Sequence, residues 1–450
     1  MSRRWGLALV ALCIGCSGTA IVSSSAATSA PSDAPAISGA RLDEERERYL
    51  NDGAARRAEL VRSLTRPENT YSRQRLDAYG LGDRGWDLLP AWNPRTRAMN
   101  AELAARVERG EALDAEGLAP LWDGVMPSTE QGWIELGRRV FFEFPMRAEI
   151  LVEHALGDPA GAEALGVERA ADGHVPGAVV FLDVDREVRV GMSCALCHSA
   201  IEGGAVVPGR ARRSLDVGRM RMAWLTARDG AVDARDAQRL GRWGPGRADV
   251  TEDDDEDPVA IPDLWGLRDE RWLTQGATLR QESPIALAIR QETQLIDSNH
   301  LLVRPRRELV WALVMYLYSL APPRSGEAPP PGVEAGRALF DEHCRSCHSN
   351  AALGGEPIDA SAIGTDPALA NGKGRGTGRY RVPPLLAIGR GAPYLHDGSV
   401  ASLDELLSPE RLSADYTRGR FGPGPIPGHP AGTRLDAEAR ASLLAYLATL

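Results

Sequence analysis

The cysteines of this chain constrain its fold more than any other feature. The sequence has 450 residues and six cysteines, and four of the six form two Cys-x-x-Cys-His motifs, at 194–198 and 344–348. The other two, Cys13 and Cys16, lie in an N-terminal segment that predicts export. The folded domains therefore keep no cysteine for a disulfide, which is unusual for an exported protein unless all four thiols are committed to another bond.

Three kinds of site use two cysteines at this spacing. A zinc ribbon brings two such pairs within about 15–20 residues of each other, whereas Cys194 and Cys344 are 150 residues apart. A redox dithiol needs no adjacent histidine and is expected once. Covalent haem c explains the whole motif, because two thiols bond the haem vinyl groups and the next imidazole binds the iron. The sequence thus predicts two haem c groups on Cys194, Cys197, His198, Cys344, Cys347 and His348, with His198 and His348 as proximal iron ligands.

The N-terminus predicts a signal peptide. Arg3 and Arg4 precede an apolar segment, residues 5–14, that is too short to cross a bilayer. Cys16 lies in what resembles a lipoprotein cleavage box, although Cys13 replaces the usual leucine; cleavage within residues 23–30 is the alternative. We expect a periplasmic or cell-envelope protein, bound to a membrane only through a lipid on Cys16.

Each haem motif lies in a similar setting. Residues 129–144 and 332–348 both place a Gly-Arg pair three residues before a phenylalanine on an amphipathic helix. Apolar helices are predicted at 306–323 and 436–450. This pattern indicates an internal duplication. The predicted organisation is a signal and leader at 1–30, an N-terminal helical extension at 31–129, a first haem domain at 130–321 with an insertion at 150–190 that carries a short β-hairpin, a Pro-rich linker at 322–332 and a second haem domain at 333–450.

Three segments resemble the di-haem cytochrome c peroxidase superfamily, which includes MauG-type and rubber-oxygenase-type enzymes. They are ELGRRVFFEF (135–144), RVPPLLAIGRGAPYLHDGSVASLDELL (381–407) and IPGHPAGTRLDAEARASLLAYLATL (426–450). The resemblance covers roughly residues 130–450. It implies a mainly α fold, with two cytochrome c-like helical haem domains in tandem, long loops and a small β-hairpin insertion.

The second haem has two candidate sixth ligands, His429 and His396. No methionine follows Met315, so a methionine ligand from the loop before the last helix is excluded. His429 lies just before the closing helix, where the resembled family places this ligand, and we favour it over His396 or an open position. The structural alternatives are a solvated loop histidine at His429 and a turn-stabilising histidine at His396.

The first haem lacks a comparable ligand. The peroxidase branch places a histidine shortly after this motif, whereas residues 201–220 contain none. Met220, Met222 and, more remotely, His174 are the candidates, and both methionines are as readily explained by core packing. We expect an open or water-bound iron that binds peroxide or dioxygen.

Residues 259–299 resemble the family segment that carries a distal carboxylate and a residue between the haems. By position, Glu292 or Gln291 is the acid/base candidate and Trp272 the inter-haem candidate, with Glu282 as a rival carboxylate. The structural alternatives are an exposed helix face around Glu292 and a core position for Trp272.

The predicted function is an exported di-haem oxidoreductase, peroxidase-like, with a reactive first haem and an electron-transfer second haem. The alternatives are a dioxygen-dependent oxygenase acting on an organic substrate, and a non-catalytic electron carrier. The expected partners are hydrogen peroxide or dioxygen and a small donor protein such as a mono-haem cytochrome or a cupredoxin. A formal net charge of −10 argues against nucleic acid. The acidic stretch 251–258 is a weak Ca²⁺ candidate, and a solvated loop is the favoured interpretation.

Overall fold

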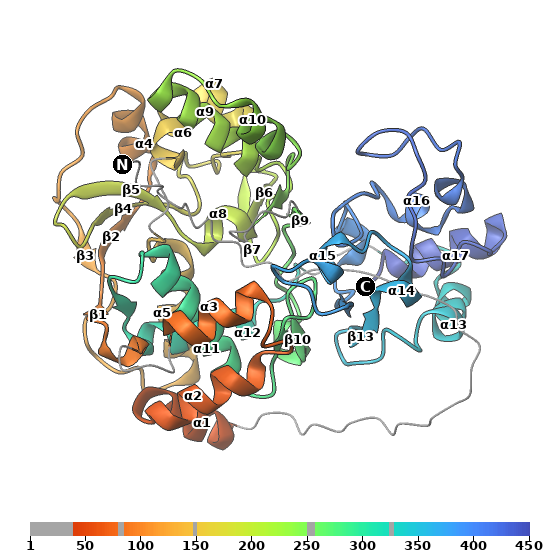
Figure 1. The fold of residues 1–450 in the computed structure, drawn as a ribbon, viewed down its shortest axis with the longest axis horizontal. Coiled ribbons are helices and arrows are strands. Elements are labelled where there is room, and N and C mark those ends of the chain that lie inside the picture. Colours follow the sequence, from red (N-terminus) through yellow and green to blue (C-terminus); the bar gives the residue numbers. More distant parts are fainter. Residues whose placement is uncertain (1–38, 80–84, 147–150, 250–256, 324–327) are drawn as a thin grey trace.

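The computed structural model describes residues 39–79, 85–146, 151–249, 257–323 and 328–450. The predicted signal peptide with Cys13 and Cys16 and most of the acidic stretch 251–258 lie outside these ranges. The fold is mainly helical with several small sheets, as predicted (Figure 1). Within the described residues, no helix is both long enough and apolar enough to cross a membrane.

The described elements fall into an N-terminal segment and two units. The N-terminal segment contains α1 (Gly39–Asn51), α2 (Gly53–Ser63), α3 (Thr70–Tyr79), η1 (Trp86–Leu88), β1 (Ala91–Trp92), β2 (Arg95–Ala98), α4 (Ala101–Glu108) and β3 (Ala119–Pro120). The first unit contains α5 (Glu130–Glu143), α6 (Leu151–Leu156), α7 (Pro159–Ala164), β4 (Ala178–Leu182), β5 (Val188–Met192), α8 (Cys194–His198), β6 (Ser199–Glu202), β7 (Ala205–Pro208), α9 (Val217–Asp229), α10 (Ala234–Gly241), β8 (Arg247–Ala248), β9 (Val259–Ala260), η2 (Leu267–Asp269), β10 (Trp272–Leu273), β11 (Leu279–Arg280), α11 (Pro284–Ser298), β12 (Arg304–Pro305) and α12 (Arg307–Ser319).

The second unit is smaller and lies beside the first (Figure 1). It contains α13 (Val333–His343), β13 (Gly355–Asp359), α14 (Ala360–Ile363), α15 (Ala368–Asn371), β14 (Arg379–Val382), η3 (Ile388–Arg390), α16 (Leu403–Leu407), η4 (Pro409–Leu412) and α17 (Ala437–Leu447).

Each unit is built on one pair of crossing helices. In the first, α5 begins at the N-cap Thr129, whose hydroxyl accepts the N–H of Gly132, and crosses α12 at Gly137. A Cβ on Gly137 would overlap the carbonyl oxygen of Ala312, so only glycine allows this approach. Phe141, one turn later, packs on Tyr316 with ring centroids 5.2 Å apart.

The second unit repeats this crossing between α13 and α17. A Cβ on Gly336 would overlap the carbonyl oxygen of Ser442, and Phe340 packs on Tyr446 with ring centroids 5.4 Å apart. In both units the glycine precedes the phenylalanine by four residues. At this spacing the glycine and the phenylalanine lie on the same face of their helix, so both contact the helix that crosses it. The two helix pairs are therefore structural equivalents, as an internal duplication would require.

The duplication extends into the loops with a constant offset of 121 residues. The short helix η2 begins at Leu267 and η3 at Ile388. Leu273 pairs with Leu279 across an antiparallel ladder, and Tyr394 pairs with Val400 in the same way.

The loops of the two units also bond each other reciprocally. The N–H of Ala260 donates to the carbonyl of His396 (2.9 Å), and the N–H of Arg381 donates to the carbonyl of Gln275 (3.0 Å). Adding 121 to 260 and to 275 gives 381 and 396, so each bond is the counterpart of the other. At this junction, equivalent backbone positions of the two units are therefore paired as in a local two-fold arrangement.

The N-terminal segment packs mainly on the first unit. Helices α1 and α2 lie against α11, and α1 also contacts α12. Strands β2 and β3 extend the β4–β5 hairpin into a four-stranded sheet of order β3-β2-β4-β5. The hairpin of the predicted insertion is thus present, and it is completed by strands from the extension.

Candidate functional site

The second Cys-x-x-Cys-His motif opens into an apolar cavity. The cavity encloses about 600 Å³ of empty space, including open solvent at its mouth. His348 lines it from the end of α13, and His429 lines it from the loop before α17. Its other walls are mostly aliphatic, including Leu385, Leu407 and Leu443. An apolar cavity with two imidazoles suits a flat hydrophobic group that carries a metal.

The ring of His348 is held by backbone carbonyls. Its Nδ1 lies 2.6 Å from the carbonyl oxygen of Leu353, and the carbonyl of Pro383 also interacts with it. Burial lowers the pKa of His348. A neutral imidazole that donates through Nδ1 keeps its lone pair on Nε2, which is the state of a metal ligand.

His429 is placed by a strained backbone. Its φ is +47°, and the conformation is held by a bond from its N–H to Ile363 (3.2 Å) and one from Arg411 to its carbonyl (2.7 Å). Burial, then the nearby His348 and Arg411, lower the pKa of His429 to about 3. Its Nδ1 is buried and has no hydrogen-bond partner within the described residues. An imidazole that lines an apolar cavity and has a buried Nδ1 fits a metal ligand better than a solvated loop histidine.

His396 lies outside the residues that line this cavity. It is buried against Tyr380, with ring centroids 4.4 Å apart and the phenol oxygen 3.3 Å from Nε2. Its carbonyl accepts the inter-unit bond from Ala260. These contacts place His396 at the junction of the two units.

The first motif forms the short buried helix α8. Ser193 caps it, accepting from the N–H of Ala195 and donating to the carbonyl of Phe142 at the end of α5 (2.8 Å). His198 Nδ1 lies 3.0 Å from the carbonyl oxygen of Pro262. Pro262 and Pro383 differ by 121 residues, so equivalent loops supply a carbonyl to each motif histidine.

The motif cysteines form no disulfides. Burial raises the pKa of the Cys194 thiol to about 12 and that of Cys197 to about 11. The Cys344 thiol behaves in the same way, with a pKa of about 12. Neutral thiols in apolar surroundings are poor redox dithiols.

The candidate sixth ligands of the first motif lie in different surroundings. Met220 is buried in α9 within the main core, and Met222 is only partly buried. His174 is partly exposed and its Nδ1 contacts Asp172. Between residues 130 and 321, within the described ranges, His198 is the only buried histidine.

Glu292 and Gln291 are buried in α11, so the expectation of an exposed helix face there is wrong. Glu292 accepts from the Tyr49 hydroxyl (2.7 Å) and from Arg307 Nε (3.1 Å). Burial raises the pKa of Glu292, and Arg307 opposes this effect. These bonds tie Glu292 to α1 and α12. Gln291 is also buried, and its Nε2 has no hydrogen-bond partner within the described ranges.

Trp272 and Glu282 lie nearer the surface. The Trp272 indole donates to Glu356 Oε2 (3.0 Å) in β13 and is partly exposed, so the expected core position is wrong. It bridges the two units at their rim. Glu282 pairs with Arg280 (2.5 Å) and is half-exposed.

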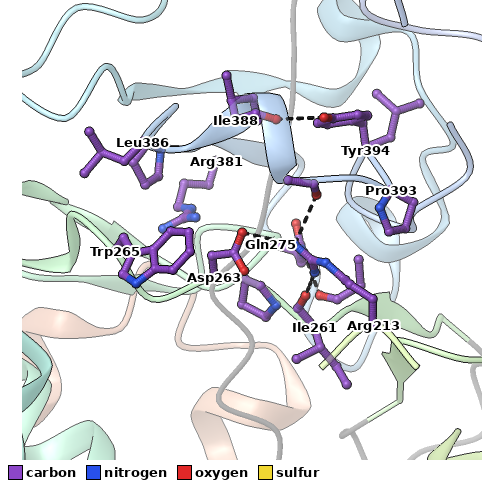
Figure 2. A pocket seen from close by; sticks show the side chains of 15 residues that line it. Arg213, Ile261, Asp263, Trp265, Gln275, Arg381, Leu386, Ile388, Pro393 and Tyr394 are labelled. Carbon is purple, nitrogen blue, oxygen red and sulfur yellow. Dashed lines mark hydrogen bonds and ion pairs between the residues drawn. The ribbon is translucent and has the colours of Figure 1, made fainter. Parts of the chain in front are cut away.

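A second pocket, of about 530 Å³ including open solvent, lies between the units (Figure 2). Trp265 lines it, together with Asp263, Gln275 and Arg381. The Trp265 indole donates to the carbonyl of Pro208 (3.2 Å), at the end of the β-hairpin that follows His198. Sequence reasoning selected Trp272 and did not consider Trp265. The 121-residue offset places Trp265 opposite Leu386, and both residues line this pocket.

No described part of the chain gathers three or more His, Cys, Asp or Glu side chains as a metal site. Of the predicted Ca²⁺ stretch, Asp257 is described, and it pairs with Arg375 (3.1 Å). An aspartate neutralised by a buried arginine is a weaker cation ligand.

Residues 333–450 match the family model for cytochrome c. The match begins at the first residue of α13 and implies a covalently bound haem c in the second unit. No curated protein matches the chain. Among solved structures, a MauG-like protein associated with microbial copper homeostasis is 19% identical, with a TM-score of 0.37 over 73% of this chain and 90% of that one. A similarity at this level carries no argument about the site.

Proposed function

We propose that this protein is an exported di-haem c-type cytochrome oxidoreductase of peroxidase type. Cys194, Cys197 and His198 would hold a haem whose iron would supply reactivity toward hydrogen peroxide or dioxygen. Cys344, Cys347 and His348 would hold a haem that would supply electron transfer, with His429 as a second protein ligand to its iron. A small electron-donor protein, such as a mono-haem cytochrome or a cupredoxin, supplies the electrons.

The observation that carries this proposal is the pair of histidines in the second unit. His348 and His429 line one apolar cavity. In the first unit, residues 201–220, which follow His198, contain no histidine. An iron with two strong protein ligands is coordinatively saturated and suits electron transfer, whereas one that lacks a second ligand can bind a small molecule.

The residues present fit covalent haem on both motifs. Each motif supplies two thiols and a histidine whose Nδ1 lies within hydrogen-bond distance of a backbone carbonyl. When bound, haem iron supplies the redox chemistry. The chain's own contribution is to orient the two proximal rings, to exclude water with aliphatic walls around His348 and to offer His429 as a second protein ligand in the second unit.

Electron paramagnetic resonance of the oxidised, purified holoprotein tests the proposal. We expect one high-spin ferric signal from the first haem and one low-spin signal from the second. Two low-spin signals with no high-spin component would overturn the assignment in favour of an electron carrier. A high-spin signal combined with a stable dioxygen complex and slow peroxide consumption would replace the peroxidase reaction with an oxygenase one.

A further inference from the structure

We propose that Glu270 of the first unit is a positioning residue for the second haem. It acts through Asn350 on the turn whose Leu353 carbonyl holds His348. The inference rests on the proposed function, in which His348 is the proximal ligand of the electron-transfer iron. It assigns to the unit with the reactive iron a direct influence on the potential of the other iron.

The turn after His348 is organised by one side chain. Asn350 Oδ1 accepts from the backbone N–H groups of Gly354 (2.6 Å) and Ala352 (3.0 Å). Leu353, between them, has a φ of +58°, a left-handed conformation that is unfavourable for a residue other than glycine. Because the turn holds Leu353 in this conformation, the Leu353 carbonyl oxygen lies 2.6 Å from His348 Nδ1.

Asn350 is itself held from the other unit. Its Nδ2 donates to Glu270 Oε1 (3.1 Å) and to the backbone carbonyl of Asp269 (3.3 Å). The second carboxylate oxygen of Glu270 accepts from Arg381 Nη1 (3.2 Å). Both Glu270 and Arg381 are almost fully buried, so this ion pair is rigid and unscreened by solvent.

The contact between Glu270 and the turn leaves no room for a side chain at position 354. A Cβ on Gly354 would overlap Glu270 Oε1 and approach Asn350 Nδ2 to 3.0 Å. The carboxylate therefore packs directly on the backbone of the turn. A movement of Glu270 away from the turn would break its hydrogen bond with Asn350.

The chemical consequence concerns the basicity of the proximal imidazole. A strong Nδ1–H bond to a carbonyl gives the ring more imidazolate character, which stabilises ferric iron and lowers the reduction potential. The negative charge of Glu270 acts in the same direction. Weakening either effect should raise the potential of the second haem.

Spectroelectrochemical titration of the full-length holoprotein at pH 8 tests the inference. Asn350→Ala removes the side chain that organises the turn, and Glu270→Gln removes the charge while keeping an acceptor for Asn350. Glu356→Gln is the control, because Glu356 bonds Trp272 across the same junction but is exposed. At the wild-type midpoint potential of the second haem, we expect Asn350→Ala to raise its reduced-to-oxidised ratio about tenfold, which is ~59 mV for one electron.

Glu270→Gln should raise the same ratio severalfold, and Glu356→Gln should leave it within twofold. The imidazole N–H proton resonance of His348 should also shift in Asn350→Ala. Ratios within twofold of wild type for both Glu270→Gln and Asn350→Ala would overturn the inference alone. If Asn350→Ala fails to take up haem, Glu270→Gln decides. A wild-type protein without a low-spin haem on His348 would instead overturn the proposed function, and the inference with it.

Discussion

Gln275 occupies in the first unit the place that His396 occupies in the second. Each carbonyl accepts a hydrogen bond from the other unit, from Arg381 and Ala260 respectively. The Gln275 side chain donates to the carbonyl of Ala260 (3.3 Å), whereas the His396 ring packs on Tyr380 at a tilt of 35°. The duplicated backbone is thus conserved between the units while the chemistry of its side chains has diverged.

Replacing His429 by alanine should convert the second haem from low-spin to high-spin, because the cavity then retains only the His348 imidazole. Electron paramagnetic resonance and the visible spectrum would record the change. His396→Ala is the matched control, since His396 is a buried histidine of the same unit that lies outside the cavity, and it should leave the low-spin signal intact. If the low-spin signal disappears in His396→Ala and persists in His429→Ala, the sixth ligand is His396.

Gly336→Ala should lower the free energy of unfolding by about 1–3 kcal/mol, because the new methyl group overlaps the Ser442 carbonyl at the α13–α17 crossing. Thermal unfolding followed by circular dichroism measures it. The control is Gly241→Ala, in α10, where a Cβ meets nothing within 4 Å and should be neutral or stabilising by roughly 0.5–1 kcal/mol. Equal stability of the two variants would contradict the close crossing.

Glu270 should make stability depend on pH. Burial raises its pKa to about 7 from 4.5, with Arg381 opposing the shift. The folded protein then binds more protons than the unfolded chain between these values, so the free energy of unfolding falls as pH rises from 4.5 to 7, by up to about 3 kcal/mol. Chemical denaturation at several pH values tests this, and Glu270→Gln should flatten that part of the profile. An identical slope in the variant would assign the dependence to other groups.

Glu292→Ala should destabilise the protein by about 3 kcal/mol, because Arg307 and Tyr49 lose a buried partner. Glu282→Ala, which breaks an ion pair nearer the surface, should cost less than about 1 kcal/mol. Denaturation curves and peroxide turnover should be measured on both. Unchanged stability with lost turnover in Glu292→Ala would support the acid/base role that its sequence position suggested.

The sequence was sufficient to predict the helical frame, because spacing alone determines it. Gly137 with Phe141 and Gly336 with Phe340 repeat at one interval, and the structure crosses both helices at those glycines. The preference for His429 over His396 agrees with the cavity, which His429 lines and His396 does not; ligation of an iron by His429 stays a prediction.

The surroundings of α11 could not be predicted. A polar run such as residues 290–294 is typical of an exposed face, but α1 and α2, from more than 200 residues earlier, cover it and supply Tyr49. Likewise, Glu270 and Asn350 are 80 residues apart and belong to different units. Contacts of this kind depend on how separate segments pack, which local periodicity does not encode.

The reciprocal bonds from Ala260 to His396 and from Arg381 to Gln275 have the form of an isologous interface, the kind that joins identical subunits in a two-fold dimer. In such an interface, the same surface patch of each subunit contacts its copy on the other subunit. A single chain therefore contains, at the junction of its halves, the geometry by which two copies of one ancestral haem unit would recognise each other.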